Sequence, residues 1–418
     1  MKVLVVGGGG REHAICWKLA QSPRVTELYC APGNAGIAQV ATCVPIKATD
    51  VDAMVAWAKE NAMDFVMVAP DDPLALGMVD ALEAVGIAAF GPRANAAIIE
   101  ASKAFSKELM KKYNIPTAKY ETFTELDKAL AYIRAQGAPI VVKADGLALG
   151  KGVVVAATVE EAEQAVREMM EDKKFGASGS TVVIEECMVG PEVTVLAFCD
   201  GEHLVPMLSS QDHKRAYDGN KGPNTGGMGA FCPSPNYTPE VAAFCEKNIF
   251  QPTVNALKAE GRPFKGVIYF GLMLTKDGPR VVEYNARFGD PETQPILSML
   301  DTDLMDIFQA CVDGTLDKVD IKWKKGAACC IVLASGGYPV SYQSGYPISG
   351  LEEAGKNATV FHAGTKVNDK GEIVNAGGRV LGVTVTGDSL SDAISKAYAA
   401  AKPITWTDMH YRTDIGKV

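Results

Sequence analysis

The alternation of short apolar strands with helices over the first hundred residues is the feature that most constrains the fold. Each apolar run is short and is followed by a helical stretch or by a glycine or proline turn. Strands that alternate with helices in this way pair in parallel, with helices on both faces of the sheet. We therefore expect a doubly wound α/β domain over residues 1–102, with strands at residues 2–6, 27–30, 64–69 and 86–90 and a helix at residues 12–21.

Beyond residue 102 the pattern changes to strands in hairpin-like pairs. The residues from 94 to 113 predict one helix, which ends before Pro116. Thr238 and Pro239 predict the start of a long helix that Gly261 ends. Strand pairs are expected at residues 139–143 with 152–156, 181–185 with 192–198, and 266–275 with 280–285.

The final segment has strands and a helix of its own, at residues 328–334, 380–386 and 390–401. A chain of 418 residues is long enough for about three domains. We therefore expect an α/β protein of the α+β multi-domain type. After the first domain, the expected boundaries are 103–327, with a lid subdomain at about 119–190 and a central part at 191–327, and 328–418.

Composition excludes several classes of protein. The net charge of −9 argues against a nucleic-acid or anionic-membrane surface, because such partners require a broad positive field. The N-terminal apolar run is too short for a signal peptide, and no segment approaches the length of a membrane helix. Ten scattered cysteines without a C-x-x-C spacing predict reduced thiols rather than disulfides or zinc ligands, and thus a cytoplasmic protein.

Four glycines, Gly7 to Gly10, stand between the first strand and the first helix and are followed by Arg11. Backbone N–H groups at a helix start attract anions, so a compact phosphate monoester is the favoured ligand. A dinucleotide fingerprint fits poorly, because His13 or Glu12 occupies the place of its third small residue and the second strand ends without a ribose-binding acid. A purely structural turn stays open, as it does for residues 31–36 after the second strand.

A second glycine-rich loop covers residues 146–152 and follows Lys143. It is not a P-loop, because Gly152 stands where a metal-binding hydroxyl belongs and a strand follows where a helix is required. The loop can instead fold over phosphates, with Lys143 neutralising a phosphate charge. A flexible hairpin with solvated lysines is the alternative.

The strand at residues 281–287 carries the most specific pattern. Residues two apart share a face of a strand, so Glu283, Asn285 and Arg287 are expected to point the same way. Carboxylate and amide oxygens suit Mg²⁺, and a cation beside them suits a transferring phosphoryl group. A polar edge strand facing solvent is the alternative.

A polar, glycine-rich segment at residues 212–229 is suited to a loop ordered around a small polar substrate, although a solvated loop would look similar. His13, His203, His362 and His410 show no metal-ligand spacing, and we interpret them as structural or surface residues.

Together these segments resemble the ATP-grasp superfamily and, within it, the phosphoribosylamine–glycine ligase family. The resemblance runs from end to end of the chain, through VVGGGGREHA, APGNAG, IPTAKYETF, VVKADGLALGKGVVVA, QDHKRAYDGNKGPNTGGMGA, EYNARFGDPETQ and YRTDIG. The chain departs from the usual family pattern at residues 69–72, at Ala101 and at Asn220. None of these departures touches the predicted metal ligands or phosphate-binding lysines.

The resemblance implies a role for each part of the site. Lysines beneath the 146–152 loop would contact ATP phosphates, the segment after residue 184 would form the adenine hinge and bind the ribose, and Arg287 would steady the transferred phosphoryl group. For ATP the implied residues are Lys103, Lys143, Gly146, Gly150, Lys151, Gly152, Glu185, Glu186, Met188 and Glu192, of which Lys143 is catalytic together with Arg287. The implied metal ligands, for Mg²⁺ or Mn²⁺, are Glu283 and Asn285. For the substrates they are Gly8, Gly9, Gly10, Arg11, Asn34, Asp212, Lys214, Arg215, Asn224, Thr225, Gly226, Gly227, Arg287, Gly289 and Asp290.

The family implies ATP-dependent ligation of glycine to 5-phosphoribosylamine in purine biosynthesis, through a glycyl phosphate intermediate. We expect small-molecule substrates as partners, neither nucleic acid nor membrane, and a monomer or weak homo-oligomer. The alternatives are a sister ligase with another acid or amine, a nucleotide-binding dehydrogenase that uses the N-terminal glycines, and a non-catalytic ATP sensor.

Overall fold

The first hundred residues form a parallel sheet of five strands, in the order β3-β2-β1-β4-β5. In the first strand, Val3 and Val5 enter one core cluster whereas Leu4 and Val6 enter another, so both faces are covered and the predicted doubly wound sheet is confirmed. The computed structural model describes residues 1–148 and 151–417. Its N-terminal elements are β1 (Lys2–Gly7), α1 (Gly10–Leu19), β2 (Glu27–Pro32), β3 (Thr42–Cys43), α2 (Val51–Glu60), β4 (Phe65–Val68), α3 (Asp71–Ala75), α4 (Met78–Ala84) and β5 (Ala88–Phe90).

The single helix predicted at residues 94–113 is wrong, because the structure has two. Helix α5 (Ala94–Ala101) ends at Ser102, whose backbone is extended, and α6 (Lys103–Lys112) begins after it. The Ser102 hydroxyl accepts a hydrogen bond from the N–H of Phe105 at 3.0 Å. A serine that caps a new helix in this way competes with continuation of the old one.

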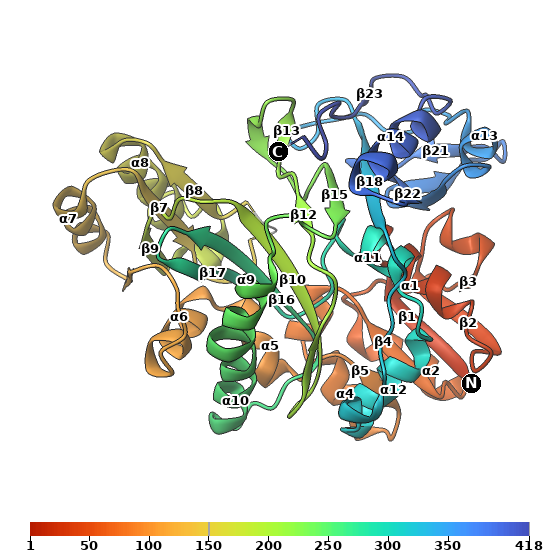
Figure 1. Cartoon of the computed structure of the whole chain (residues 1–418), viewed down its shortest axis with the longest axis horizontal. Helices are drawn as coiled ribbons and strands as arrows, with labels where there is room; N and C mark the ends of the chain where they lie inside the picture. Colours follow the sequence, from red (N-terminus) through yellow and green to blue (C-terminus); the bar gives the residue numbers. More distant parts are fainter. Residues whose placement is uncertain (149–150, 418) are drawn as a thin grey trace.

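A small unit, residues 120–186, follows as an antiparallel sheet in the order β6-β9-β7-β8 with two helices on it (Figure 1). The predicted hairpin at residues 139–156 is confirmed by the pairing of β7 with β8. The predicted pairing of residues 181–185 with 192–198 is wrong, because β9 belongs to this sheet and β10 to the next. The elements are β6 (Tyr120–Phe123), α7 (Leu126–Gln136), β7 (Ile140–Ala144), β8 (Val153–Ala156), α8 (Val159–Met170) and β9 (Val182–Glu186).

The central sheet has the order β11-β10-β16-β17, and the predicted hairpin of its last two strands is confirmed. The predicted long helix is confirmed too: Thr238 caps it and Gly261, at φ +71°, follows it, with one π-helical turn at Glu246–Phe250. The Phe250 ring packs on Phe270 of the sheet with centroids 4.5 Å apart. The elements are β10 (Glu192–Asp200), β11 (Leu204–Pro206), α9 (Pro239–Cys245), α10 (Gln251–Ala259), β16 (Lys265–Thr275) and β17 (Gly278–Asn285).

The last sheet combines strands from two distant segments, in the order β12-β15-β18-β22-β19 with β23 on β18. Its predicted strands and helix near residues 327–335, 379–387 and 390–401 are confirmed. The elements of the remaining chain are β12 (Gln211–Asp212), β13 (Arg215–Tyr217), β14 (Lys221–Asn224), β15 (Gly229–Cys232), α11 (Thr293–Met299), α12 (Leu304–Asp313), β18 (Ala327–Ser335), α13 (Leu351–Gly355), β19 (Thr359–His362), β20 (Thr365–Val367), β21 (Ile373–Asn375), β22 (Arg379–Gly387), α14 (Leu390–Ala401) and β23 (Met409–His410).

Buried clusters show which parts pack together. One cluster joins the N-terminal sheet to α12, the central sheet and β19, and a second joins the other face of the N-terminal sheet to α9–α10. The small unit has a separate cluster, whose fully buried members all lie between Ala129 and Ile184. Within the residues that are described, no helix has both the length and the apolar character needed to cross a bilayer.

Candidate active site

Strand β17 presents a polar face toward its C-terminal end. Glu283 and Asn285 alternate with Tyr284, which is buried in the core on the other side. Gly271 of β16 lies opposite Glu283, and a Cβ there would approach the Glu283 Cγ to 3.0 Å. The predicted common face of Glu283 and Asn285 is therefore present, and a small neighbour leaves room beside the carboxylate.

Lys214 is the cation closest to this carboxylate. Its Nζ lies 3.3 Å from Glu283 Oε1 and 3.9 Å from Glu192 Oε2, although Lys214 and Glu283 are far apart in sequence. Burial acts to raise the pKa of Glu283, but Lys214 and then Lys143 outweigh it and hold that pKa below its usual range. Glu283 is thus an ionised acid among lysines.

Lysines from α6 and β7 approach the same face. Lys143 Nζ donates to the carbonyl of Val282 at 3.0 Å and lies 3.1 Å from Glu185 Oε1, which Lys107 also approaches to 3.2 Å. Lys103 Nζ donates to the carbonyl of Gly146 at 2.9 Å. The two predicted phosphate lysines therefore lie between the small unit and the central sheet, and the Glu185 carboxylate is held by lysines.

Arg287 is held from two sides. Its Nη2 lies 3.1 Å from Glu100 Oε1 and 3.4 Å from Asn285 Oδ1, and its Nη1 donates to the carbonyl of Phe288 at 3.2 Å. Glu100 also accepts from the N–H of Ala286 at 2.7 Å. The Arg287 Nε is buried and has no hydrogen-bond partner in the described residues. One N–H of this fixed guanidinium is therefore unpaired within the described residues.

The N-terminal glycine turn packs against the segment after β17. The Gly9 N–H donates to Glu12 Oε2 at 2.9 Å, and Arg11 forms an ion pair with Glu12 at 2.8 Å. Arg11 Nη1 also donates to the carbonyl of Phe288 at 3.2 Å, and its backbone N–H lies 3.4 Å from Asp290 Oδ2. Two predicted regions that lie 279 residues apart in the sequence therefore meet.

Asn34 and the glycines of the 225–229 segment brace this junction. Asn34 Nδ2 donates to the carbonyls of Gly8 at 3.0 Å and His362 at 2.7 Å, while its Oδ1 accepts from Gly36 and Ile37. A Cβ on Gly226 would lie 2.8 Å from the Arg379 Cζ. Arg379 in turn donates to the carbonyl of Asp290 at 2.8 Å. The side-chain amide of Asn34 therefore has its hydrogen bonds filled from within the protein.

The other predicted residues lie around the rim. Glu186 pairs with Arg280 at 3.2 Å, Met188 is half-buried, and Lys151 is exposed. Arg215 is exposed and donates to the carbonyl of Gly222 at 2.8 Å, away from Glu283 in its own hairpin. Gly150 lies outside the described residues. The remaining predicted positions belong to these same segments: Gly10, Gly152, Glu192, Asn224, Thr225, Gly227 and Gly289.

Three charged residues of the site were missed in the sequence: Glu100, Lys107 and Arg379. Glu100 is the one charged residue of α5, a helix whose other residues are apolar except for Asn95, and such an acid is itself a signal, because buried acids need partners. Lys107 lies one helical turn from Lys103 and shares its face. No local pattern distinguishes Arg379.

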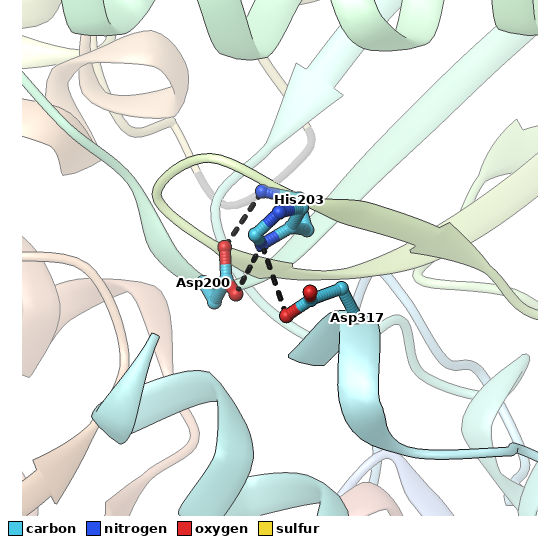
Figure 2. Close-up of side chains that lie close together, drawn as sticks. All are labelled: Asp200, His203 and Asp317. Atoms are coloured by element: carbon cyan, nitrogen blue, oxygen red, sulfur yellow. Dashed lines mark hydrogen bonds and ion pairs between the residues drawn. The ribbon is translucent and has the colours of Figure 1, made fainter. Parts of the chain in front are cut away.

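A cluster of Asp200, His203 and Asp317 lies at the far end of β10 (Figure 2). The Asp200 carboxylate accepts from the N–H groups of Glu202, His203 and Leu316 at 2.9, 2.6 and 3.0 Å, and lies 2.9 Å from His203 Nδ1. These hydrogen bonds occupy the carboxylate oxygens of Asp200, so we interpret the cluster as structural rather than as a metal site.

The sequence matches three models of one protein family in succession. They are the phosphoribosylglycinamide synthetase N domain at residues 1–100, its ATP-grasp (A) domain at residues 101–293 and its C domain at residues 328–418. The chain is 51% identical to the phosphoribosylamine–glycine ligase of Xanthomonas campestris, over all of this chain and 97% of that one.

Solved structures of other proteins have the same fold as this chain. The phosphoribosylamine–glycine ligase of Thermotoga maritima matches with a TM-score of 0.87 and 31% identity, covering 99% of this chain and 100% of that one. Biotin carboxylase of Campylobacter jejuni matches with a TM-score of 0.76 at 14% identity, over 98% of this chain and 92% of that one, which shows the shared fold alone. The ATP-grasp fold expected from the sequence is confirmed, and the chain belongs to the phosphoribosylglycinamide synthetase family.

Proposed function

We propose that the protein joins glycine to 5-phosphoribosylamine with ATP, giving glycinamide ribonucleotide, ADP and phosphate in purine biosynthesis. Family membership over the whole length supports this activity. The observation that carries it is the polar face of β17, where Glu283 meets Lys214, with Lys143 on one side and Arg287 on the other. Such a face suits a reaction between two anions, a carboxylate and the γ-phosphate of ATP.

The ATP-grasp family uses ATP with a divalent metal, and the residues present fit one. Glu283 and Asn285 offer two oxygen donors on one strand face, the set that Mg²⁺ or Mn²⁺ takes. We infer that these two residues hold the metal. When bound, it supplies positive charge that offsets the repulsion between the two anions.

Lysine and arginine side chains of the protein also neutralise negative charge. Lys103 and Lys143 neutralise the phosphates beneath the 146–152 loop, while the 185–192 segment, which crosses between the two sheets, binds adenine and ribose. Arg287, fixed by Glu100 and lying beside Asn285, supplies positive charge to the phosphoryl group as that group moves to the glycine carboxylate. The amine of phosphoribosylamine then attacks glycyl phosphate and releases phosphate.

Substrate groups have separate places. The glycine turn with Arg11, together with the 212–229 segment, binds phosphoribosylamine and glycine near Asp290. Glycyl phosphate hydrolyses readily, so the loop over the phosphates serves to exclude water. A domain division at residues 102 and 327, a cytoplasmic location and a monomeric or weakly associating state stay predictions.

The test is ADP release with ATP, Mg²⁺ and glycine, with and without phosphoribosylamine generated in the assay. We expect release only when both substrates are present. Release with another acid or amine in place of these two would favour a sister ligase. Folded protein that releases no ADP with the named pair would refute the proposal.

A further inference from the structure

The C-terminal segment, residues 410–416, lies against the β13–β14 hairpin within the 212–229 segment. Arg412 makes two of the contacts: its Nη1 donates to the carbonyl of Arg215 at 3.1 Å, and its Nη2 donates to Asn220 Oδ1 at 3.0 Å. The Arg412 side chain is only 1% exposed, and an arginine buried to this extent needs specific partners. The proposed function gives no role to this segment, although its YRTDIG motif belongs to the family resemblance.

The residues that follow Arg412 hold the same hairpin. The Thr413 N–H donates to Asp218 Oδ1 at 2.8 Å, and the Thr413 hydroxyl donates to the other oxygen of that carboxylate. Asp414 Oδ2 accepts from the N–H of Gly219 at 2.9 Å. Asp414 also accepts two hydrogen bonds from Arg412, at 2.7 and 2.9 Å, which hold the pKa of Asp414 below its usual range. Charge-assisted hydrogen bonds of this kind are among the stronger ones in proteins.

Lys214 lies between two residues that the C-terminal segment holds. On one side, Gly416 donates its backbone N–H to His213 Nε2 at 3.2 Å. An imidazole nitrogen accepts only when it is unprotonated, and burial lowers the pKa of His213 to about 4, which keeps the ring neutral. On the other side, the carbonyl of Arg215 accepts the hydrogen bond described above. The backbone is therefore fixed on both sides of Lys214, whose side chain reaches Glu283.

Ile415 packs on the other end of the 212–229 segment. It is fully buried, and a Cβ on Gly229 would lie 2.9 Å from the Ile415 Cδ1. Between the two ends, the N–H and the hydroxyl of Thr225 each donate to the carbonyl of Lys214 at 2.7 Å. The part of the segment that carries these two residues is therefore held at both ends by the C-terminal segment.

We propose that Arg412 is a positioning residue, which fixes the 212–229 segment in the place where that segment binds substrate. This assignment rests on the proposed function and adds to it a role for the C-terminal segment. Arg412 acts through the carbonyl of Arg215, the neighbour of Lys214. Lys214 Nζ in turn lies 3.3 Å from Glu283 Oε1 on the polar face of β17. The position of a substrate-binding segment thus depends on residues about 200 positions further along the chain.

The first experiment is steady-state kinetics on Arg412→Gln, with ATP, glycine and phosphoribosylamine varied in turn. We expect the KM for glycine, for phosphoribosylamine or for both to rise about tenfold, because the segment that binds them loses its fixed position. The KM for ATP should stay within about twofold of the wild type, since the lysines proposed to contact its phosphates lie on α6 and β7. A merely structural role would reduce the amount of active protein, and thus kcat, without raising a KM.

The second experiment needs no activity and is trypsin digestion of the whole protein without substrates. The hairpin offers exposed cleavage sites at Arg215 and Lys221. We expect Arg412→Gln to speed cleavage at these sites about tenfold relative to sites elsewhere, because proteolysis follows local opening. Lys396→Gln is the matched control: it removes an exposed lysine that pairs with Asp392 within α14, and it should change neither the KM values nor the cleavage of the hairpin.

The assignment is overturned if Arg412→Gln leaves the KM values for glycine and phosphoribosylamine unchanged, if the KM for ATP rises equally, or if Lys396→Gln has the same effects. Should Arg412→Gln fail to fold, Thr413→Val takes its place. Thr413 is exposed and the change removes one hydrogen bond to Asp218, so both measurements should move in the same direction by about twofold to fivefold.

The two experiments also separate this assignment from the proposed function. Wild-type protein that releases no ADP with the named substrates would refute the proposed function. A hairpin that resists trypsin equally in Arg412→Gln and in the wild type would refute the positioning role alone.

Discussion

The small unit, residues 120–186, and the central sheet are both four-stranded antiparallel sheets, yet they are buried differently. The small unit buries its apolar face under its own two helices, in a cluster whose buried members all lie within residues 129–184. The central sheet buries its faces against the N-terminal sheet, α9–α10 and α12, in clusters that draw on residues from 3 to 361. The small unit thus has a core of its own, which we call the private core. The central sheet contributes to a core that it shares with other elements, which we call the shared core.

This difference has a functional meaning. Near the site, the small unit contacts its neighbours through polar groups, such as Lys143 to Val282, Lys103 to Gly146 and Ser102 to Asp145. Polar contacts of this kind can exchange with water or with a ligand, whereas a shared apolar core cannot separate without a large cost. We therefore infer that the small unit closes over ATP on a fixed central sheet.

The largest expected effect concerns the fixed side of the site. Glu283→Gln keeps the size of the side chain and removes its charge, so we expect kcat to fall by about a thousandfold. The fold should persist, with the Tm within about 3 °C of the wild type, because Glu283 is not part of a core. The rate of ADP release measures kcat, and thermal unfolding measures the Tm. Near-normal turnover would remove the metal assignment.

The shared core gives the next largest effect. Phe308 is fully buried, and its ring lies 4.1 Å from Phe90 and 6.1 Å from Phe288. We expect Phe308→Ala to lower the free energy of unfolding by about 3–5 kcal/mol, as for other buried phenylalanines. Urea denaturation should show the loss of stability. Hydrogen exchange, measured separately, should rise in both the N-terminal and the central sheets. Raised exchange in only one of them would contradict a shared core.

A matched change in the private core should act locally. Ile133 is fully buried in α7, and Ile133→Ala is expected to cost about 2–4 kcal/mol of local stability. Hydrogen exchange should rise across residues 120–186 and stay unchanged elsewhere, with a higher KM for ATP. If the N-terminal sheet also loses protection, the two cores are coupled and the comparison fails.

The smallest expected effect is a pH dependence of the free energy of unfolding, which should not extend to the small unit. His13 is buried against His362, whose N–H donates to His13 Nδ1 at 2.7 Å, and burial lowers the pKa of His13 to about 3. The folded state therefore binds fewer protons than the unfolded state below pH 6.5, so stability falls as the pH falls toward 3. Between pH 6.5 and 5.5 His13 should account for about 1 kcal/mol of this loss.

None of the five histidines lies within residues 120–186, so this loss should spare the small unit. His13→Gln should reduce the slope of stability against pH for the rest of the chain, as measured by urea denaturation at several pH values. An unchanged slope would show that His13 contributes nothing to the acid sensitivity.

Much of the fold follows from local sequence. Periodicity two gives Glu283 and Asn285 a common face, and a strand that runs into a glycine loop positions Lys143. The same patterns failed to predict the break between two helices at Ser102, because the cap of the second helix lies inside an uninterrupted apolar pattern. They also misjudged the partner of β9, because periodicity shows that a strand exists but not which strand it pairs with.

The sequence alone determined the family, the parallel N-terminal sheet, the strand with the candidate metal ligands and the lysines around it. Only the tertiary structure decided which distant charges meet: Lys214 with Glu283, and Arg287 with Glu100. The reason is physical. Backbone geometry is set by neighbours in the chain, whereas the charge on a buried side chain depends on groups that folding brings from hundreds of residues away.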